Sequence, residues 1–409
     1  MIMKGYILIL LICLIGCTGN VSKDVDNGKY VETIPFDVKK HEMKIGMDIS
    51  YMLDTSYFEI IPLETNNNCL IAEISNLYLI NDKIVIYDEM AKGAYIFNRD
   101  GSYHAKVRAV GQGPGEYPNF VNDVNASDNY IGVLNPLGIM LYNYNGKYEK
   151  TISLHNLWGR KIFTFDEEDY FLVNDWSMNF NMDASVLVHF FKIDSKNNQL
   201  FYFIPFSLKD INNQRGWGVK RFYSLYNDTA LFYWGSCDTL YSVNSNGEVS
   251  PRYFIDIIHD KLPEEIRKGD GTKAMIYAAN NNKVLGILDV METPRYLFLT
   301  ANEGRIAIYD KQKKETIAIA GSFMVPQFWD ELQFIINFSS REGDMVIAYL
   351  DGYNAFNINK YIAEQKSQKK WELGDGITPF QKELFRITKD MRDEEDNPIL
   401  LIFKMKDER

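Results

Sequence analysis

The sequence predicts an all-β fold, a six-bladed β-propeller with four-stranded blades. Short apolar β runs alternate with polar turns along most of the chain. Similar turns recur about every 45 to 65 residues, which is near the spacing of propeller blades. One four-stranded sheet cannot bury both of its faces, whereas blades arranged around an axis bury one another's faces. We expect the last blade to be closed by an N-terminal strand and to carry two inserted helices.

The first two units are the clearest. Four short β runs lie between residues 77 and 107, and four more lie between residues 121 and 154. The turn Asp100-Gly101 of the first unit matches Asn145-Gly146 of the second, because an aromatic residue precedes each turn and a β run follows it. Such turns are typical of hairpins, so we interpret each unit as one blade.

Three further units are less regular. Each shows two β runs joined by a polar turn, which predicts the outer strands of the third, fourth and fifth blades. The pairs are Leu187–Ile193 with Phe201–Ile204, Thr239–Val243 with Pro251–Ile255, and Arg305–Tyr309 with Glu315–Ala320.

The sixth unit contains an insertion. We expect Gln333–Phe338 and Met345–Leu350 to be its inner strands, followed by two helices. The helices are Tyr353–Gln368 and Thr378–Arg386, of which the second begins with a good N-cap and a Pro. The last strand, Ile399–Met405, leaves this blade one strand short. The spare run Phe58–Leu63 can pair with it, so both ends of the chain would close the ring.

The N-terminal segment resembles a secretory leader. Lys4 precedes an apolar run from Tyr6 to Ile15, and Gly16 precedes Cys17. A charged start, a short apolar core and a small residue before the cut are the parts of a signal peptide. The run is too short to span about 30 Å of hydrocarbon as a helix. A Cys directly after the small residue is similar to the lipobox of bacterial lipoproteins, in which that Cys is acylated.

The chain therefore divides into three predicted parts. Residues 1–16 are a signal peptide, residues 17–45 are an acylated Cys with a flexible tether, and residues 46–409 are the propeller. Acyl chains on Cys17 would hold the protein on a membrane, since each buried CH₂ contributes about 0.8 kcal/mol.

Composition excludes some partners. The net charge is −11, and nucleic-acid binding requires a basic face, so we expect no nucleic acid. After the leader and the acylated Cys, only Cys69 and Cys237 remain, and we interpret both as buried small hydrophobes. The five His residues form no metal-ligand pattern, and no Gly-x-Ser-x-Gly motif occurs. We expect no metal and no cofactor.

The segment Val110–Tyr117, which reads VGQGPGEY, resembles the GxGPGEY motif of six-bladed β-propeller lipoproteins of Bacteroidetes. Three further segments extend the resemblance over nearly the whole mature chain: Ile61–Glu64, Ile96–Gly101 and Asn397–Lys406. The resemblance implies an NHL-like propeller in the cell envelope, anchored by lipid to the outer membrane. It leaves the membrane face and the biochemical role open.

The glycine-rich segment has two interpretations. Its three Gly and one Pro favour a tight structural loop. The functional alternative is a nest of N–H groups with Gln112, Glu116 and Tyr117 facing a ligand. We also predict ligand contacts from Arg108 and Arg160, which lie near predicted blade entries and would either attract an anion or pair with carboxylates of the protein. Trp176 and Trp234 lie in or near the long inter-strand segments of the third and fourth units, where they would either stack on a sugar or pack between blades.

The function predicted from these features is noncatalytic binding of a protein partner or a small ligand, such as a glycan or a peptide, on the loop-rich face. The alternative is a propeller enzyme of lyase, lactonase or hydrolase type with a site at the channel mouth. The fold alone does not choose between them.

Overall fold

The structure is a computed structural model of the chain. The predicted signal peptide and Cys17 lie outside the described residues, as do Thr378 and the first part of Gln333–Phe338. The structure describes residues 31–43, 47–48, 52–179, 187–205, 223–226, 228–234, 237–267, 269–302, 305–320, 323–324, 337–342, 345–367, 379–389, 391 and 395–406.

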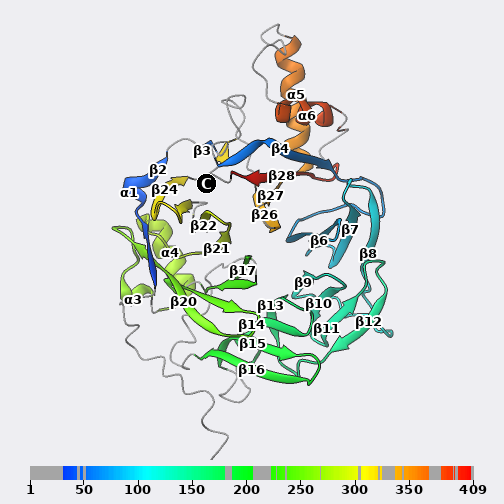
Figure 1. Cartoon of the computed structure of the whole chain (residues 1–409), viewed down its shortest axis with the longest axis vertical. Coiled ribbons are helices and arrows are strands. Elements are labelled where there is room, and N and C mark those ends of the chain that lie inside the picture. Colours follow the sequence, from blue (N-terminus) through cyan, green and yellow to red (C-terminus); the bar gives the residue numbers. More distant parts are fainter. Residues whose placement is uncertain are drawn as a thin grey trace, which may run out of the picture.

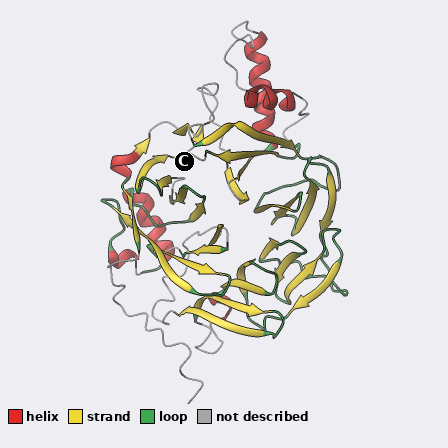
Figure 2. Cartoon of the chain, in the orientation of Figure 1, coloured by secondary structure: helices red, strands yellow, loops and turns green. Residues whose placement is uncertain are grey.

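Six four-stranded antiparallel blades stand around a common hub, as Figures 1 and 2 show, so the predicted six-bladed propeller is confirmed. Blades 1 to 3 follow one another along the chain. From the hub outward, blade 1 contains β5 (Asn76–Ile80), β6 (Lys83–Asp88), β7 (Gly93–Asn98) and β8 (Tyr103–Val107). Blade 2 contains β9 (Asp123–Ala126), β10 (Ile131–Asn135), β11 (Gly138–Tyr142) and β12 (Tyr148–Ile152). Blade 3 contains β13 (Gly159–Thr164), β14 (Asp169–Asn174), β15 (Val188–Asp194) and β16 (Gln199–Pro205).

Blades 4 and 5 each carry an additional outer strand from the N-terminal segment. Blade 4 contains β17 (Tyr223–Tyr226), β18 (Thr229–Phe232), β19 (Thr239–Asn244) and β20 (Val249–Ile257). Blade 5 contains β21 (Asp289–Glu292), β22 (Tyr296–Thr300), β23 (Ile306–Asp310) and β24 (Glu315–Ala320).

Blade 6 joins the two ends of the chain, as the sequence predicts. Its strands are β26 (Asn337–Glu342), β27 (Met345–Leu350), β28 (Ile399–Met405) and β4 (Leu53–Pro62). In the antiparallel pair of β28 and β4, Ile399 lies opposite Pro62 and Phe403 lies opposite Phe58. The ring is therefore closed by backbone hydrogen bonds between one strand near the start of the described chain and one near its end.

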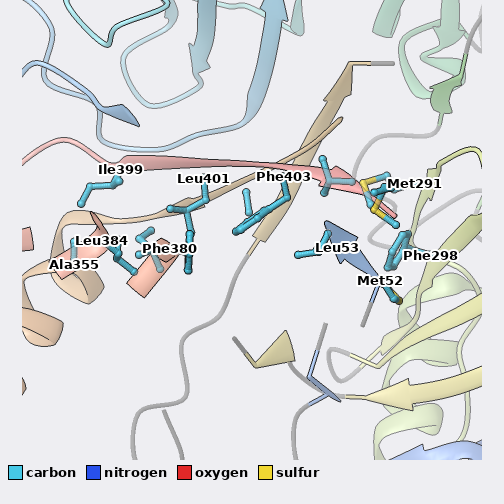
Figure 3. Close-up of a cluster of buried hydrophobic side chains, with 14 of the residues drawn as sticks. Met52, Leu53, Met291, Phe298, Ala355, Phe380, Leu384, Ile399, Leu401 and Phe403 are labelled. Carbon is cyan, nitrogen blue, oxygen red and sulfur yellow. The ribbon is translucent and has the colours of Figure 1, made fainter. Parts of the chain in front are cut away.

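Both predicted late helices are present. α5 (Gly352–Ser367) and α6 (Pro379–Thr388) form an insertion between β27 and β28 that projects from the ring in Figure 1. Figure 3 shows the apolar cluster beneath it. The ring of Phe380 on α6 lies 5.3 Å from the rings of both Phe58 and Phe403. The insertion thus packs on the two strands that close the propeller.

An N-terminal strap, Glu32–Met43, is a feature that the sequence analysis did not predict. It contains β1 (Glu32–Phe36), α1 (Val38–His41) and β2 (Glu42–Met43). β1 lies parallel to β20 of blade 4, and β2 lies parallel to β24 of blade 5. Beyond the strap, β3 (Met47–Asp48) pairs with the short strand β25 (Phe323–Met324). The range predicted as a flexible tether, residues 17–45, therefore includes residues that pair with the propeller.

Three helices within the ring were also not predicted. α2 (Trp176–Asn179) follows β14, and α3 (Glu264–Arg267) and α4 (Gly271–Asn281) connect blades 4 and 5. The carboxylate of Asp270 caps α4 by accepting the Lys273 N–H, and Asn282 ends it in the left-handed conformation.

The antiparallel order of the strands gives the propeller two different faces. The connections between blades, and the turns between the second and third strands of each blade, emerge on one face, which we call the loop-bearing face. The remaining turns, which are short hairpins, emerge on the other face. Helices α2 to α6 all belong to connections of the loop-bearing face. Surface insertions of this kind commonly carry binding sites.

Candidate functional site

A buried carboxylate ties three blades together beside the hub. Asp123 on β9 is fully buried. It accepts hydrogen bonds from Asn76 Nδ2 on β5 at 2.8 Å, from Lys161 Nζ on β13 at 3.1 Å and from the Ile162 N–H at 3.0 Å. Burial raises the pKa of Asp123, while the ammonium of Lys161 and the hydrogen bonds oppose that rise. The inner strands of blades 1, 2 and 3 are therefore held by one side chain.

Two tyrosines meet across the hub. Blades 1 and 4 are opposite each other in a ring of six. Tyr78 on β5 donates to the Val124 carbonyl at 2.8 Å, and Tyr223 on β17 lies close enough to its hydroxyl to oppose the rise in the pKa of Tyr78. Tyr223 in turn donates to the Ile162 carbonyl at 2.7 Å. Burial raises the pKa of Tyr78, so its hydroxyl stays protonated at neutral pH. These contacts link the inner strands of blades 1 to 4 at the hub.

The glycine-rich segment Val110–Tyr117 forms a tight loop between blades 1 and 2. The Gly113 N–H donates to Glu116 Oε2 at 2.7 Å, and the Glu116 N–H donates back to the Gly113 carbonyl at 3.0 Å. Gly115 has a φ of +76°, and a Cβ at this position would lie 2.7 Å from the ring of Tyr148. The carboxylate of Glu116 thus stabilises its own loop, which agrees with the structural interpretation.

Tyr117 does not face solvent, so the structure does not support its predicted ligand contact. It is fully buried between blades 1 and 2, and its hydroxyl donates to the Lys92 carbonyl at 2.9 Å. Burial raises the pKa of Tyr117 to about 12. Gln112 and Glu116, in the same loop, are exposed.

Trp234, predicted to stack on a sugar, already stacks on protein rings. Its indole lies 3.8 Å from His189 of blade 3 and 5.5 Å from Tyr241 of its own blade, with both rings nearly parallel to it. Burial lowers the pKa of His189 to about 3, so the imidazole of the stack is neutral at physiological pH. This arrangement favours packing between blades over sugar binding at Trp234.

The other predicted contact residues are distributed along the ring. Arg108 is exposed at the end of blade 1, and Arg160 is exposed on β13 of blade 3. Trp176 begins α2. Arg108 therefore belongs to blade 1, whereas Arg160 and Trp176 both belong to blade 3.

Most of the exposed large apolar residues lie on connections of one face of the propeller. Ten large apolar residues are exposed in the described part of the chain, and nine of them lie on connections of the loop-bearing face. Those nine are Leu70, Met90, Val110, Phe120, Leu137, Met178, Met275, Ile276 and Tyr353. The tenth, Phe201, lies on the outer strand β16. Apolar groups on one surface mark a site of association, whereas single scattered ones do not.

Three of these residues, Phe120, Leu137 and Met178, lie on connections of blades 1 to 3, as does the half-buried Trp158, and sequence reasoning missed them as a group. We call Phe120, Leu137, Trp158 and Met178 the hub patch. The rings of Phe120 and Trp158 make an edge-to-face contact at 5.9 Å, although they come from two different connections. Phe120 and Leu137 are 53% and 59% exposed. An aromatic residue shortly before an inner strand was the only signal in the sequence.

The described residues were also compared with the requirements for a metal site, a membrane-spanning helix and a reactive thiol. No group of three His, Cys, Asp or Glu residues that could hold a metal ion occurs there. No described helix is long and apolar enough to cross a membrane. Cys69 is buried as expected, whereas Cys237 is half-buried, and burial raises the pKa of both thiols. Both are therefore weak nucleophiles.

These features define a six-bladed β-propeller in which most exposed large apolar residues of the described chain lie on connections of the loop-bearing face. The chain belongs to the family described as a domain of unknown function, DUF4934, which matches residues 31–404. No curated protein matches the sequence.

Two solved structures from Bacteroides resemble the chain. One, from Bacteroides fragilis, is of a protein described as exported. It has a TM-score of 0.65 and 19% identity and covers 91% of this chain and 99% of its own. The other, a member of the DUF4221 family from Bacteroides vulgatus, has a TM-score of 0.48 and 13% identity. It covers 87% of this chain and 98% of its own. At these identities the likeness concerns the fold.

Proposed function

We propose that this protein is an extracytoplasmic lipoprotein, tethered to a membrane by acylated Cys17, whose propeller binds a partner protein without catalysis. The leader and the Cys17 motif support the tether. The description of the Bacteroides fragilis protein as exported supports the compartment. The resemblance to NHL-like envelope lipoproteins supports the outer membrane as its location.

One observation carries the binding role: nine of the ten exposed large apolar residues of the described chain lie on the loop-bearing face. Burying such side chains against a partner contributes about 25 cal/mol per Å². Exposing these side chains on the loop-bearing face does not stabilise the fold of an isolated monomer. The loop-bearing face is therefore the binding surface in this proposal.

A protein is favoured over a small ligand by the hub. Propellers that take small ligands can hold them in the central channel, and here Tyr78 and Tyr223 meet across it. Trp234 is stacked on two protein rings, which leaves a glycan little of its surface. A glycan or a peptide remains the secondary expectation.

Fractionation and cross-linking test both parts of the proposal. The native protein should sediment with envelope membranes, and Cys17→Ala should be soluble or unprocessed. A Cys17→Ala protein that still sediments would refute the lipid anchor. Photo-cross-linking residues at positions 90 and 276, on the loop-bearing face, should capture an envelope protein, and one at position 201 should not. Capture from position 201 alone would refute the assignment of the face.

A further inference from the structure

We infer that the outer strand of blade 3, β16, is an edge at which two copies of this protein pair strand to strand. This inference concerns the rim of the propeller, and it goes beyond the proposed function, which concerns the loop-bearing face. Three properties carry it, and among the described residues no other outer strand combines them. The edge is open, its backbone is regular and it has no charged residue.

The first property is the open edge. In blade 3 the strand order is β13-β14-β15-β16, and no described strand pairs with the outer side of β16, which lies at the outside of the ring in Figure 1. Blades 4 and 5 differ, because β1 and β2 of the strap cover their outer strands β20 and β24. An uncovered outer strand presents a row of backbone N–H and C=O groups, which is a template for a further strand.

The second property is a regular backbone. The pairing of β15 with β16 keeps one register along its whole length, with Asp194 opposite Gln199 at one end. The corresponding outer pairs of the other five blades each contain a register shift. Such irregularities bend an edge strand and hinder the approach of another strand. Ile204 has a φ of +50°, so the regular edge that can pair is Gln199–Phe203.

The third property is the absence of charge. The sequence of β16 is QLFYFIP. The other outer strands that the strap leaves uncovered carry charged residues: Lys106 on β8, Glu149 and Lys150 on β12, and Asp54 and Glu59 on β4. Charged side chains on an edge keep other strands away. Two copies that each carry a net charge of −11 repel one another, so an uncharged strand is where they can meet at the lowest electrostatic cost.

The strand is also complementary to itself. Phe201 is the central residue of the regular stretch and is 41% exposed. In an antiparallel pair of copies with a two-fold axis at this position, the two Phe201 side chains lie opposite each other, and opposed aromatic residues stabilise a strand pair. The ammonium of Lys192 lies over the Phe201 ring, 4.9 Å from its centroid, and is itself paired with Asp169 at 2.6 Å. The ring is therefore oriented before association.

The contact is small, so the association should be weak. β16 contributes seven residues from each copy. A standard protein interface contains about 20–30 residues a side, and interfaces well below that size belong to transient contacts. A covalent trap therefore detects the pair where chromatography of the isolated protein does not.

The test uses the full-length protein in its own membranes, with two differently tagged copies expressed together. Benzoylphenylalanine at position 199, which is exposed at the start of β16, should capture the copy that carries the other tag. The same probe at position 149, which is exposed on β12, is the matched control and should capture no second copy above background.

Two added substitutions separate the edge from the loop-bearing face. Phe201→Asp, combined with the probe at position 199, should lower the yield of the captured copy at least about fivefold, because each strand then brings a charge to the edge. Phe120→Asp, on the loop-bearing face, should leave that yield unchanged. Circular dichroism of the Phe201→Asp protein excludes loss of the fold as the cause of a reduced yield.

Every other outcome contradicts the inference. Equal capture from positions 199 and 149 would indicate crowding on the membrane. Capture of a different protein from position 199 would replace the second copy by a strand of another chain, and a yield that Phe201→Asp leaves unchanged would refute pairing at Phe201. No capture from position 199, with an envelope protein captured from positions 90 and 276, would refute this inference and leave the proposed function intact. The reverse result would refute the proposed function alone.

Discussion

Removal of the Asp123 carboxylate tests how the inner strands are held together. In Asp123→Ala the ammonium of Lys161, which is only 18% exposed, loses its partner, and two further donors lose their acceptor. Removing one partner of a buried ion pair lowers the free energy of unfolding by about 3–5 kcal/mol. Unfolding entropy is about 2.1 cal/mol/K per residue, so the roughly 310 residues that the structure describes give about 0.65 kcal/mol/K. A loss of about 4 kcal/mol should therefore lower the melting temperature by about 6 °C.

Differential scanning calorimetry measures this shift, and two variants control it. Asp128→Asn changes an exposed carboxylate on the same hairpin and should alter stability by no more than about 0.5 kcal/mol. The double variant Asp123→Ala/Lys161→Met removes both charges and should recover part of the loss, because no unpaired charge remains buried. A melting temperature within about 1 °C of the native value for Asp123→Ala would refute the reasoning.

Three further predictions concern the loop, the strap and the aromatic stack. Gly115→Ala should destabilise the protein by about 1–3 kcal/mol in urea unfolding, because of its positive φ and the ring beside it, whereas Gly132→Ala, which has neither problem, should not. Phe36→Ala should cost about 3–5 kcal/mol if the strap is part of the core, and Lys39→Ala, an exposed change in the same strap, should be neutral. Burial lowers the pKa of His189 to about 3 in the folded protein, whereas in the unfolded chain this imidazole binds a proton once the pH falls below about 6.5. The free energy of unfolding should therefore decrease as the pH is lowered from about 6.5 towards 3. His189→Phe should flatten that part of the pH profile, and an unchanged profile would contradict the buried, neutral imidazole.

The outer hairpins of the blades were predictable because their turns carry a local signal. Gly101, Gly146 and Gly247 all adopt positive φ at the predicted turns, with values of +86°, +77° and +80°. Inner strands such as β14 were missed because they are buried on both faces, and a continuous apolar run shows no alternation. The strap was missed for a different reason. Glu32 pairs with Tyr253, and no local pattern indicates a parallel partner more than 200 residues away.

The candidate site was less predictable than the fold. Turn chemistry in the glycine-rich loop correctly favoured a structural role, and the structure adds that Glu116 stabilises that loop. The hub patch could not be predicted, because Phe120 and Trp158 are 38 residues apart and meet only when two blades pack. Exposure is also a property of the folded surface. The same aromatic residues in a sequence are equally compatible with core packing.

The closure of blade 6 and the strap has a consequence for biogenesis. β1 needs β20, and β4 needs β28, so strands that are synthesised early find their partners only after several further blades have been made. Pairings over such sequence separations form slowly. The ring therefore cannot close before β28 has been synthesised, and until then the edge of β4 that pairs with β28 stays open.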